Sequence, residues 1–354
     1  MYYQPSRETV RPPLARLRTP TDYDPDSVPS FPARRHSSRA KSLIACFALL
    51  SPFPACNPVS NTIAVIPRSC GTVLWEPEHA GAQHAAQRNG MNVYWNAPMR
   101  EDDVAGQIDL LEKVVSRKYA GIILTPDQTL PLRSPVRRIV ERGVPLVVVG
   151  TYLGIAPNER LSYVLNDDAA GGQMAARRIG KILDGKGSVV ILGINPQLSG
   201  ITIRGRSLEN TLAQEFPGIH VVARRLGYYS VAQEQQVAED VLHRVGSVDA
   251  IVALSHVSTR GAFYALVEFG RAQSIKLVGF DQDLMPPLRT GGIDSVVMES
   301  TYDMGRIAME AMEEEVYGRS VSGIQVVPPI LMTGDNIDSP EIQRQLRADW
   351  WAPE

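Results

Sequence analysis

The sequence has few of the residues that reactive or metal-binding sites need. Its 354 residues include three cysteines, with no CxxC motif, and six histidines without metal-ligand spacing. It also lacks a GxSxG nucleophile elbow, an HExxH motif and a GxxxxGK[ST] phosphate loop. Hydrolysis, hydride transfer, phosphoryl transfer and a cofactor therefore have no support in the sequence. Binding without chemistry is favoured, and we expect the protein not to be an enzyme.

The sequence also lacks an excess of charge of either sign. Its formal net charge is −2, which gives no electrostatic reason to expect nucleic acid as a partner. Residues 1–56 contain 8 Lys and Arg against 4 Asp and Glu, a net charge of +4, so the remainder carries −6. A mildly acidic body fits a soluble protein that binds small molecules.

The first 56 residues do not have the pattern of a folded domain. Residues 1–33 are rich in Pro, Arg, Ser and Asp without apolar periodicity, which predicts a disordered N-terminal extension. A basic cluster at 34–41 precedes an apolar stretch at 42–50 and a segment of small residues and prolines that ends at Cys56. This order is typical of a secretory signal peptide over 34–56. Its apolar stretch is too short to span a bilayer.

The end of this segment, Phe53-Pro54-Ala55-Cys56, resembles a bacterial lipoprotein cleavage site, in which the cysteine becomes the lipidated first residue. The alternatives are ordinary signal-peptidase cleavage nearby or a buried apolar segment. Export would place the protein in the periplasm or at the outer face of the cytoplasmic membrane. Its attachment to the membrane would then be through a lipid anchor alone. Cys70 is then a lone thiol, or it pairs with Cys56 in an unlipidated form.

The body of the chain contains a ladder of short apolar runs, each followed by a helix-like stretch. Continuous β-branched runs predict strands that are buried on both faces of a parallel sheet. The ligand-binding loops of such sheets follow the carboxyl ends of the strands. The runs are Thr62–Ile66, Gly121–Leu124, Pro145–Val149, Ser188–Leu192, Ala250–Ala253 and Lys276–Asp281.

The ladder divides into two units. The first is predicted to contain strands at 62–67, 92–96, 120–124 and 145–149 and helices at 75–90, 102–117 and 132–142. The second, from about Leu165, is predicted to contain strands at 188–192, 219–224, 249–253 and 275–280 and helices at 168–183, 202–215, 231–245 and 257–270. Glycines are expected at element ends, where a positive φ or a helix stop is needed: Gly71, Gly90, Gly143, Gly185 and Gly270. Two such units predict an α/β fold of two doubly wound, Rossmann-like lobes around a cleft.

Several segments together resemble the type I periplasmic sugar-binding proteins, whose fold the ligand domains of LacI-type repressors share. The resemblance covers roughly residues 61–335, and residues 1–40 contain no helix-turn-helix. The segments that carry it, in order and spacing, are 62–67, Trp75 with 80–86, 120–126, 142–149, 166–173, 277–281 and 291–300.

The resemblance implies two parallel-sheet lobes joined by a three-segment hinge. Crossings are expected near residues 165, 299 and 325. Lobe 1 would hold 61–164 and 300–325, lobe 2 would hold 165–299 and 326–338, and 339–354 would form a C-terminal tail. A helix at 302–317 would pack on the first lobe through Met304, Ile307, Ala308, Ala311 and Met312.

The resemblance also implies binding residues. Trp75 matches an aromatic that stacks on the sugar ring, and Arg204 matches an arginine that forks to hydroxyls, with Arg206 as its surface neighbour. Asp281, at a strand end, would accept from two hydroxyls, and Glu299 matches a hinge glutamine. The alternatives are that Trp75 is a core residue of the first helix, that Arg204 is a solvated residue at a helix start, and that Asp281 is a structural cap.

The sequence departs from the family pattern at several cleft positions. Ser255 and His256 replace Asn-Asp, Gly150 and Thr151 replace Asp-Arg, and Thr72 replaces an asparagine. Arg68 replaces a small residue, and with Arg204 it would suit an anionic sugar unless Asp281 and Glu299 offset the charge. Arg68, His256 and Tyr152 are candidates for new contacts, and Thr72 and Ser255 stay in the predicted site.

The interpretation is an exported solute-binding protein that captures a carbohydrate and delivers it to the membrane permease of an ABC transporter by lobe closure. The alternative is a sensing module whose closed form is recognised by a sensor kinase or another regulatory partner.

Overall fold

The apolar runs form two separate sheets in the structure, a computed structural model that describes residues 61–280, 282–319 and 323–352. These residues belong to one unit of the chain, residues 56–354. Within them, the first sheet has six parallel strands in the order β11-β5-β4-β3-β1-β2. The strands are β1 (Thr62–Ile66), β2 (Asn92–Trp95), β3 (Gly121–Leu124), β4 (Leu146–Gly150), β5 (Leu161–Asn166) and β11 (Ile324–Val327).

The second sheet has the order β12-β10-β9-β8-β6-β7 among the described residues. It is parallel except at its edge, where β12 runs antiparallel to β10 and pairs Thr333 with Ser295. The strands are β6 (Lys186–Ile194), β7 (Gly218–Leu226), β8 (Ala250–Ala253), β9 (Lys276–Gly279), β10 (Ser295–Met298) and β12 (Ile330–Thr333). The predicted fold class, two parallel-dominated α/β lobes, is therefore confirmed.

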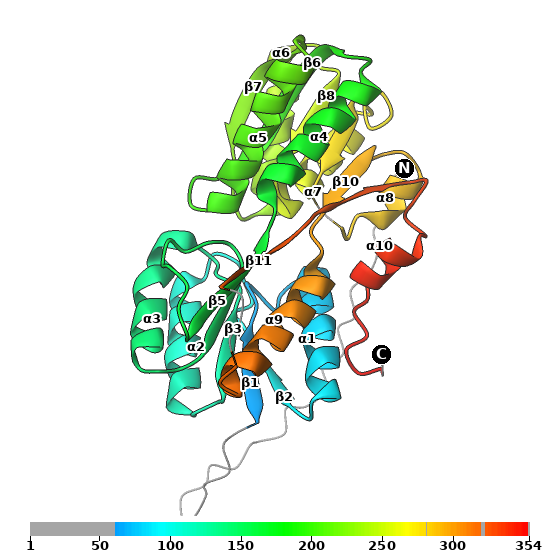
Figure 1. Cartoon of the computed structure of the whole chain (residues 1–354). Helices are drawn as coiled ribbons and strands as arrows, with labels where there is room; N and C mark the ends of the chain where they lie inside the picture. Colours follow the sequence, from blue (N-terminus) through cyan, green and yellow to red (C-terminus); the bar gives the residue numbers. More distant parts are fainter. Residues whose placement is uncertain (1–60, 281, 320–322, 353–354) are drawn as a thin grey trace, which may run out of the picture. The chain divides into compact units, whose positions relative to one another are not determined.

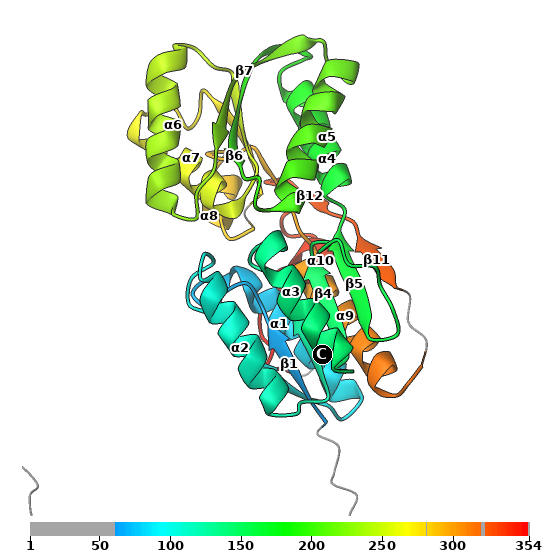
Figure 2. The ribbon, with the colours of Figure 1, turned by 90° about the vertical axis from the view of Figure 1, so that its left-hand side faces the viewer.

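Helices cover both faces of each sheet (Figures 1 and 2). On the first sheet, α1 (Glu76–Arg88) and α9 (Thr301–Val316) cover one face. The other face is covered by α2 (Val104–Ser116) and α3 (Thr129–Glu141). On the second sheet, α4 (Asp168–Ile182) and α5 (Ser199–Glu215) cover one face. The other carries α6 (Val231–Val245), α7 (His256–Glu268), α8 (Met285–Arg289) and α10 (Pro340–Gln345).

The chain passes between the two sheets three times, as the resemblance implied. It leaves the first sheet after β5, returns after β10 and leaves again after β11. The third crossing is at Pro328 and Pro329, not near residue 325, because 324–327 are hydrogen-bonded to β5. Residues 165–166 and 326–327, which were expected in the second lobe, likewise lie in strands of the first sheet.

Most predicted elements are present, and α9 packs on the first lobe through Met304, Ala308, Ala311 and Met312. Gly90, Gly143, Gly185 and Gly270 have positive φ. Gly71 does not, and it is needed because a Cβ there would meet the carbonyl oxygen of Met99. The predicted helix at 132–142 begins earlier, at Thr129, because a proline such as Pro131 is tolerated in a first turn, whose N–H groups are unbonded anyway.

Two pairs of helices approach closely beside the carboxyl ends of the strands. A Cβ on Gly81 of α1 would meet the backbone of Tyr302, and one on Gly305 of α9 would meet the backbone of Glu78. In the second lobe, a Cβ on Gly172 of α4 would meet the backbone of Arg204 on α5. Glycine therefore brings the first turns of α1 and α9 together, and likewise α4 and α5.

The C-terminal segment at 339–354, predicted as a tail, is folded in its described part. Ser339 caps α10 by accepting from the backbone N–H of Ile342, and Ile342 is buried in the core of the second lobe. Gln345 donates to the carboxylate of Asp303 on α9, and Trp350 stacks on His79 of α1 at 4.6 Å. The segment thus contacts both lobes.

Some predictions concern residues outside the described ranges. These are the extension at 1–33, the signal peptide at 34–56 with Cys56, and Asp281. In the part of the chain that is described, none of the helices combines the length and apolar character needed to cross a membrane.

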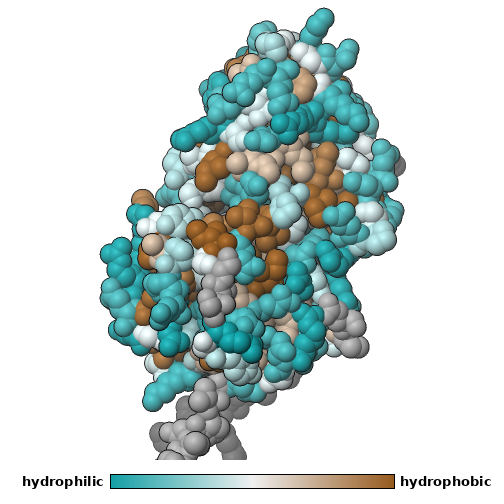
Figure 3. Space-filling view, viewed as in Figure 1, coloured by the Kyte–Doolittle hydropathy of each residue, from teal (hydrophilic) through white to brown (hydrophobic). Residues whose placement is uncertain are grey.

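Apolar side chains gather across the middle of the face shown in Figure 3, where β11 lies. This edge strand exposes Ile324 by 43% and Val326 by 57%. Its exposed side chains explain why the sequence did not predict it as a buried strand.

Candidate functional site

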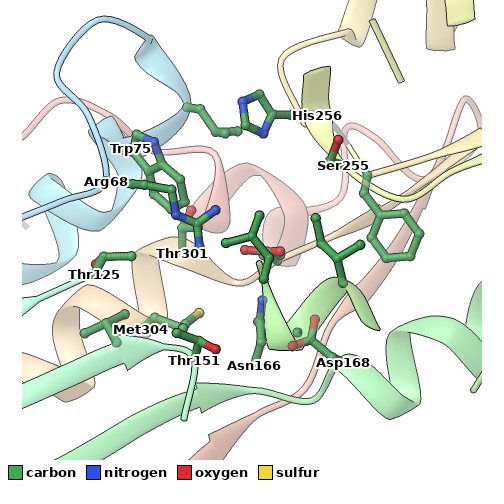
Figure 4. Close-up of a pocket in the computed structure, with 18 of the residues that line it drawn as sticks. Arg68, Trp75, Thr125, Thr151, Asn166, Asp168, Ser255, His256, Thr301 and Met304 are labelled. Atoms are coloured by element: carbon green, nitrogen blue, oxygen red, sulfur yellow. The ribbon is translucent and has the colours of Figure 1, made fainter. Parts of the chain in front are cut away.

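A cavity of about 60 Å³ lies where the strand ends of the two lobes meet. The first lobe contributes Arg68, the 3-10 turn Val73–Trp75 and the first turns of α1 and α9. The second lobe contributes Asp168, Arg204, the start of α7 and the loop after β9. The residues that line it therefore lie where ligand-binding loops are expected in doubly wound folds (Figure 4).

Contacts between the lobes close the cavity on two sides. On one side the hydroxyls of Thr151 and Ser199 are 2.7 Å apart, and Thr129 lies 3.4 Å from Ser199. On the other side Nε2 of His256 is 3.4 Å from Oε2 of Glu101. The described conformation is thus one in which the lobes touch around the site.

Arg204 is the centre of a buried ionic cluster. Its Nη2 donates to Asp168 Oδ1 at 2.6 Å and to Glu299 Oε1 at 2.7 Å, and Nη1 donates to the carbonyl oxygen of Leu254. The guanidinium carbon lies 4.1 Å from the ring centre of Phe280. Nε also donates to Asp168, so among the described residues one N–H of the five has no acceptor and remains for a ligand. The alternative of a solvated arginine is wrong, because the side chain is buried.

The cluster shifts the pKa values of its two carboxyl groups in opposite directions. Burial raises the pKa of Asp168, and the charge of Arg204 only partly offsets this. Burial also raises the pKa of Glu299, but there the charge and hydrogen bond of Arg204 outweigh it, so the net pKa is lowered. Glu299 is therefore an ionised acceptor at the hinge, held in place by Arg204.

Trp75 and Arg68 form the wall of the cavity on the side of the first lobe. Trp75 is 4% exposed, and its Nε1 donates to Glu101 Oε1 at 2.9 Å. The Arg68 guanidinium lies 5.1 Å from the Trp75 ring centre, and its Nε donates to the carbonyl oxygen of Pro126. Within the described residues, the two Nη atoms of Arg68 have no acceptor. Arg68 therefore brings free donors to the cavity and covers one face of the indole.

Ser255 and His256 line the cavity from the start of α7. Ser255 is the N-cap of the helix and forms a capping box with Ser258, so its hydroxyl already has partners. Thr72 is not brought into this cavity. It caps the turn Val73–Trp75 by accepting from the N–H of Leu74, and it lines a separate outer compartment.

The sequence analysis missed Glu78, Asn166 and Asp168. Glu78 is fully buried on α1, accepts from the Thr125 hydroxyl at 2.7 Å, and has its pKa raised by burial to about 7. Asn166 points into the cavity, and its buried Oδ1 has no partner among the described residues. Asn166 ends β5, a strand that was not predicted, and Asp168 follows it. Recognising that strand would have identified both residues.

A second carboxyl group, that of Asp127, lies buried behind Arg68. Burial raises its pKa to about 7, and neither of its oxygens has a hydrogen-bond partner in the described part of the chain. Among the described residues, no cluster of histidine, cysteine and acidic side chains could hold a metal ion. The arrangement offers hydroxyl, amide, carboxylate and guanidinium groups around an indole, which is the chemistry of hydroxyl recognition.

Comparisons with known proteins agree with this geometry. A family model described as a periplasmic binding protein domain matches residues 63–320. The xylitol-binding protein of Mycolicibacterium smegmatis is 26% identical over 288 residues, which cover 80% of this chain and 80% of that protein. A putative rhizopine-binding protein of Rhizobium meliloti is 23% identical over 301 residues, or 83% of this chain and 96% of that protein.

Solved structures show the same fold. An ABC transporter solute-binding protein from Agrobacterium vitis, bound with α-D-tagatopyranose, has a TM-score of 0.74 and 22% identity, covering 80% of this chain and 98% of that one.

Proposed function

This chain belongs to the periplasmic binding protein family, and we propose that it captures a sugar or polyol between its lobes and delivers it to an ABC permease. The observation that carries the proposal is the enclosed cavity, lined from both lobes by hydroxyl-binding groups around Trp75. Relatives named for binding xylitol, allose and ribose support the same ligand class.

The cavity supports specific roles for its residues. Trp75 would cover an apolar C–H face of the ligand, while Arg68 would donate from its free Nη atoms. Glu299, Asn166 and Glu78 would accept from hydroxyls, with His256 at the edge. Asp281 stays in the proposed set from the sequence alone. Arg204 serves mainly to hold Asp168 and Glu299 in position.

Lobe closure is the proposed mechanism. A ligand that contacts both lobes stabilises the closed state by its differential affinity for that state. The contacts Thr151–Ser199 and Glu101–His256 are made only when the lobes meet, so each adds to the closed state. The closed form would be the one that the permease recognises.

A thermal-shift screen over pentoses, hexoses, polyols and sugar acids tests ligand capture. One class should raise the melting temperature of the full chain, because a ligand that binds only the native state stabilises it. Trp75→Ala should abolish that shift, whereas Trp351→Ala, at a tryptophan that is 69% exposed, should leave it unchanged. A screen without any shift, or a full shift in Trp75→Ala, would contradict the proposal.

Export and delivery extend the proposal. The predicted signal peptide at 34–56 supports secretion, with Cys56 as the lipidated residue if the lipoprotein pathway acts. The mass of the mature N-terminus in a bacterial membrane fraction distinguishes lipidation from ordinary cleavage. Ligand-loaded protein should stimulate ATP hydrolysis by the ABC transporter that it serves.

A further inference from the structure

We propose that the ligand extends out of the inner cavity into a second compartment between the lobes, and is therefore a carbohydrate with a second hydroxylated unit, such as a glycoside or disaccharide. The inference rests on the proposed function and specifies its substrate class. It concerns the outer compartment, which borders the inner cavity at His256.

The two compartments differ greatly in size. The inner cavity has a volume of about 60 Å³. The outer compartment is about 730 Å³. It is lined by the loop Met99–Asp102 of the first lobe and by Gln197, Tyr228 and Tyr229 of the second. A sugar held in the inner cavity therefore has its free space on the outer side.

The contact that His256 makes at the boundary between the compartments is weak. Glu101 is held by the Nε1 donor of Trp75 at 2.9 Å, and its other oxygen faces His256 Nε2 at 3.4 Å. That distance is beyond the usual range of a good hydrogen bond. Moving the His256 side chain would join the two spaces while Glu101 stays anchored on Trp75.

The outer compartment has the chemistry of a neutral carbohydrate site. Its charged groups have partners: Arg100 donates to Asp102 at 2.7 and 2.8 Å, Glu101 accepts from Trp75, and Arg260 lies 3.5 Å from Asp283 outside the lining. The remaining polar groups are hydroxyls and amides, which both donate and accept as sugar hydroxyls require: Ser69, Thr72, Gln197, Ser230 and Gln233.

Two tyrosines supply aromatic surface. Tyr228 is 47% exposed, and the Tyr229 hydroxyl donates to Gln197 Oε1 at 3.4 Å. An exposed ring beside hydroxyl-binding groups can cover the C–H face of a second sugar unit. Because much of the Tyr228 ring stays in water, this side chain contributes little to the stability of the fold.

The loop that carries Tyr228 is held by the fold. The backbone N–H of Tyr228 donates to Oε1 of the fully buried Glu234 at 2.6 Å, and that of Gly227 donates to the carbonyl oxygen of Ile194. A Cβ on Gly227 would meet the backbone of Gly193. The tyrosine is therefore presented by a backbone that needs no ordering when a ligand binds, which favours affinity.

Isothermal titration of the full chain tests the inference. The probes are glucose, galactose and xylose, each as the free sugar, its methyl glycoside and its β-linked homodisaccharide. At least one extended form should bind about tenfold more tightly than its free sugar. Tyr228→Ala should remove this gain and leave binding of the free sugar unchanged, while Tyr264→Ala, at a 43% exposed tyrosine on α7 outside the cleft, should change neither.

The outcomes separate the two proposals. If a free sugar binds at least as tightly as each of its extended forms, or if Tyr228→Ala keeps the gain, the second compartment is not a subsite, although the proposed function stands. If none of the probes binds and the thermal-shift screen over pentoses, hexoses, polyols and sugar acids also gives no shift, the proposed function itself fails. An unchanged melting temperature of the unliganded variant shows that Tyr228→Ala folds.

Discussion

At the scale of single residues, burial and neighbouring donors shift the pKa of the cavity's carboxyl groups in opposite directions. Glu78 is fully buried, with a hydroxyl donor from Thr125 and the charge of Arg68 nearby. Burial dominates and raises its pKa to about 7. The folded protein therefore binds a proton at Glu78 between pH 4.5 and 7 that the unfolded chain releases. The stability of the protein must depend on pH in that window.

Glu78→Gln tests this directly. Because the pKa of Glu78 is raised in the folded state, wild-type stability falls as pH rises from about 4.5 to about 7 and is then constant. The variant lacks this loss, so it should match the wild type near pH 4.5 and exceed it by roughly 2 to 3 kcal/mol at pH 8. Urea denaturation at both pH values measures the difference. A difference that does not change with pH would mean that Glu78 is ionised throughout.

The same residues show what the sequence could and could not predict. Trp75, Arg68, Arg204, Glu299, Ser255 and His256 reach the cavity as predicted. Glu78 was missed because an acid in the first turn of a helix has the same local pattern whether it is solvated or buried. Its neighbours Thr125 and, on α9, Gly305 come from far along the chain, so the local sequence does not show its burial. Arg204 was predicted as a ligand donor, but its contacts with Asp168 and Glu299 depend on three separate elements.

At the scale of elements, the C-terminal segment joins parts of the chain that the sequence did not connect. Arg344 and Gln345 of α10 both reach Asp303 at the start of α9. Beyond them, His79 lies between Trp95, at 4.3 Å and nearly parallel, and Trp350, at 4.6 Å. Burial lowers the pKa of His79 to about 4. The imidazole is therefore neutral in the folded protein near neutral pH.

Trp350→Ala should uncover one face of His79. Its pKa should then rise from about 4 toward its ordinary value near 6.5, and stability should fall by about 1 to 2 kcal/mol. Because the unfolded chain protonates this histidine at a higher pH than the folded protein does, wild-type stability falls as pH falls from about 6.5 to about 4. The pH range of this loss should be narrower in the variant. NMR titration of the His79 ring gives the pKa. Trp351→Ala is the matched control, and an equal pKa change in both variants would exclude the stacking as the cause.

Two of the strands that the sequence missed, β11 and β12, share a physical reason. The predicted strands are continuous apolar runs buried on both faces, such as β3 and β8. In contrast, β11 is an edge strand with exposed residues, and β12 is an antiparallel edge strand that follows two prolines. Edge strands depend on a partner elsewhere in the chain, so local composition does not mark them.

At the scale of the whole molecule, the account depends on two lobes that share one site. The chain crosses between the sheets three times, and Glu299 and Asn166 stand at two of these crossings. A ligand that contacts them touches the hinge as well as both walls. Binding should therefore be linked to closure, with the lobe contact Thr151–Ser199 formed in the bound state.

Hydrogen–deuterium exchange, with and without the sugar that gives the largest thermal shift, tests this central claim most directly. The account predicts slower exchange in both lobes at once: at 73–79 and 150–153 in the first, and at 198–204 and 255–258 in the second. The outer face of α6 should not change, and it serves as the internal control. Protection confined to one lobe, or none despite measured binding, would contradict capture between the lobes.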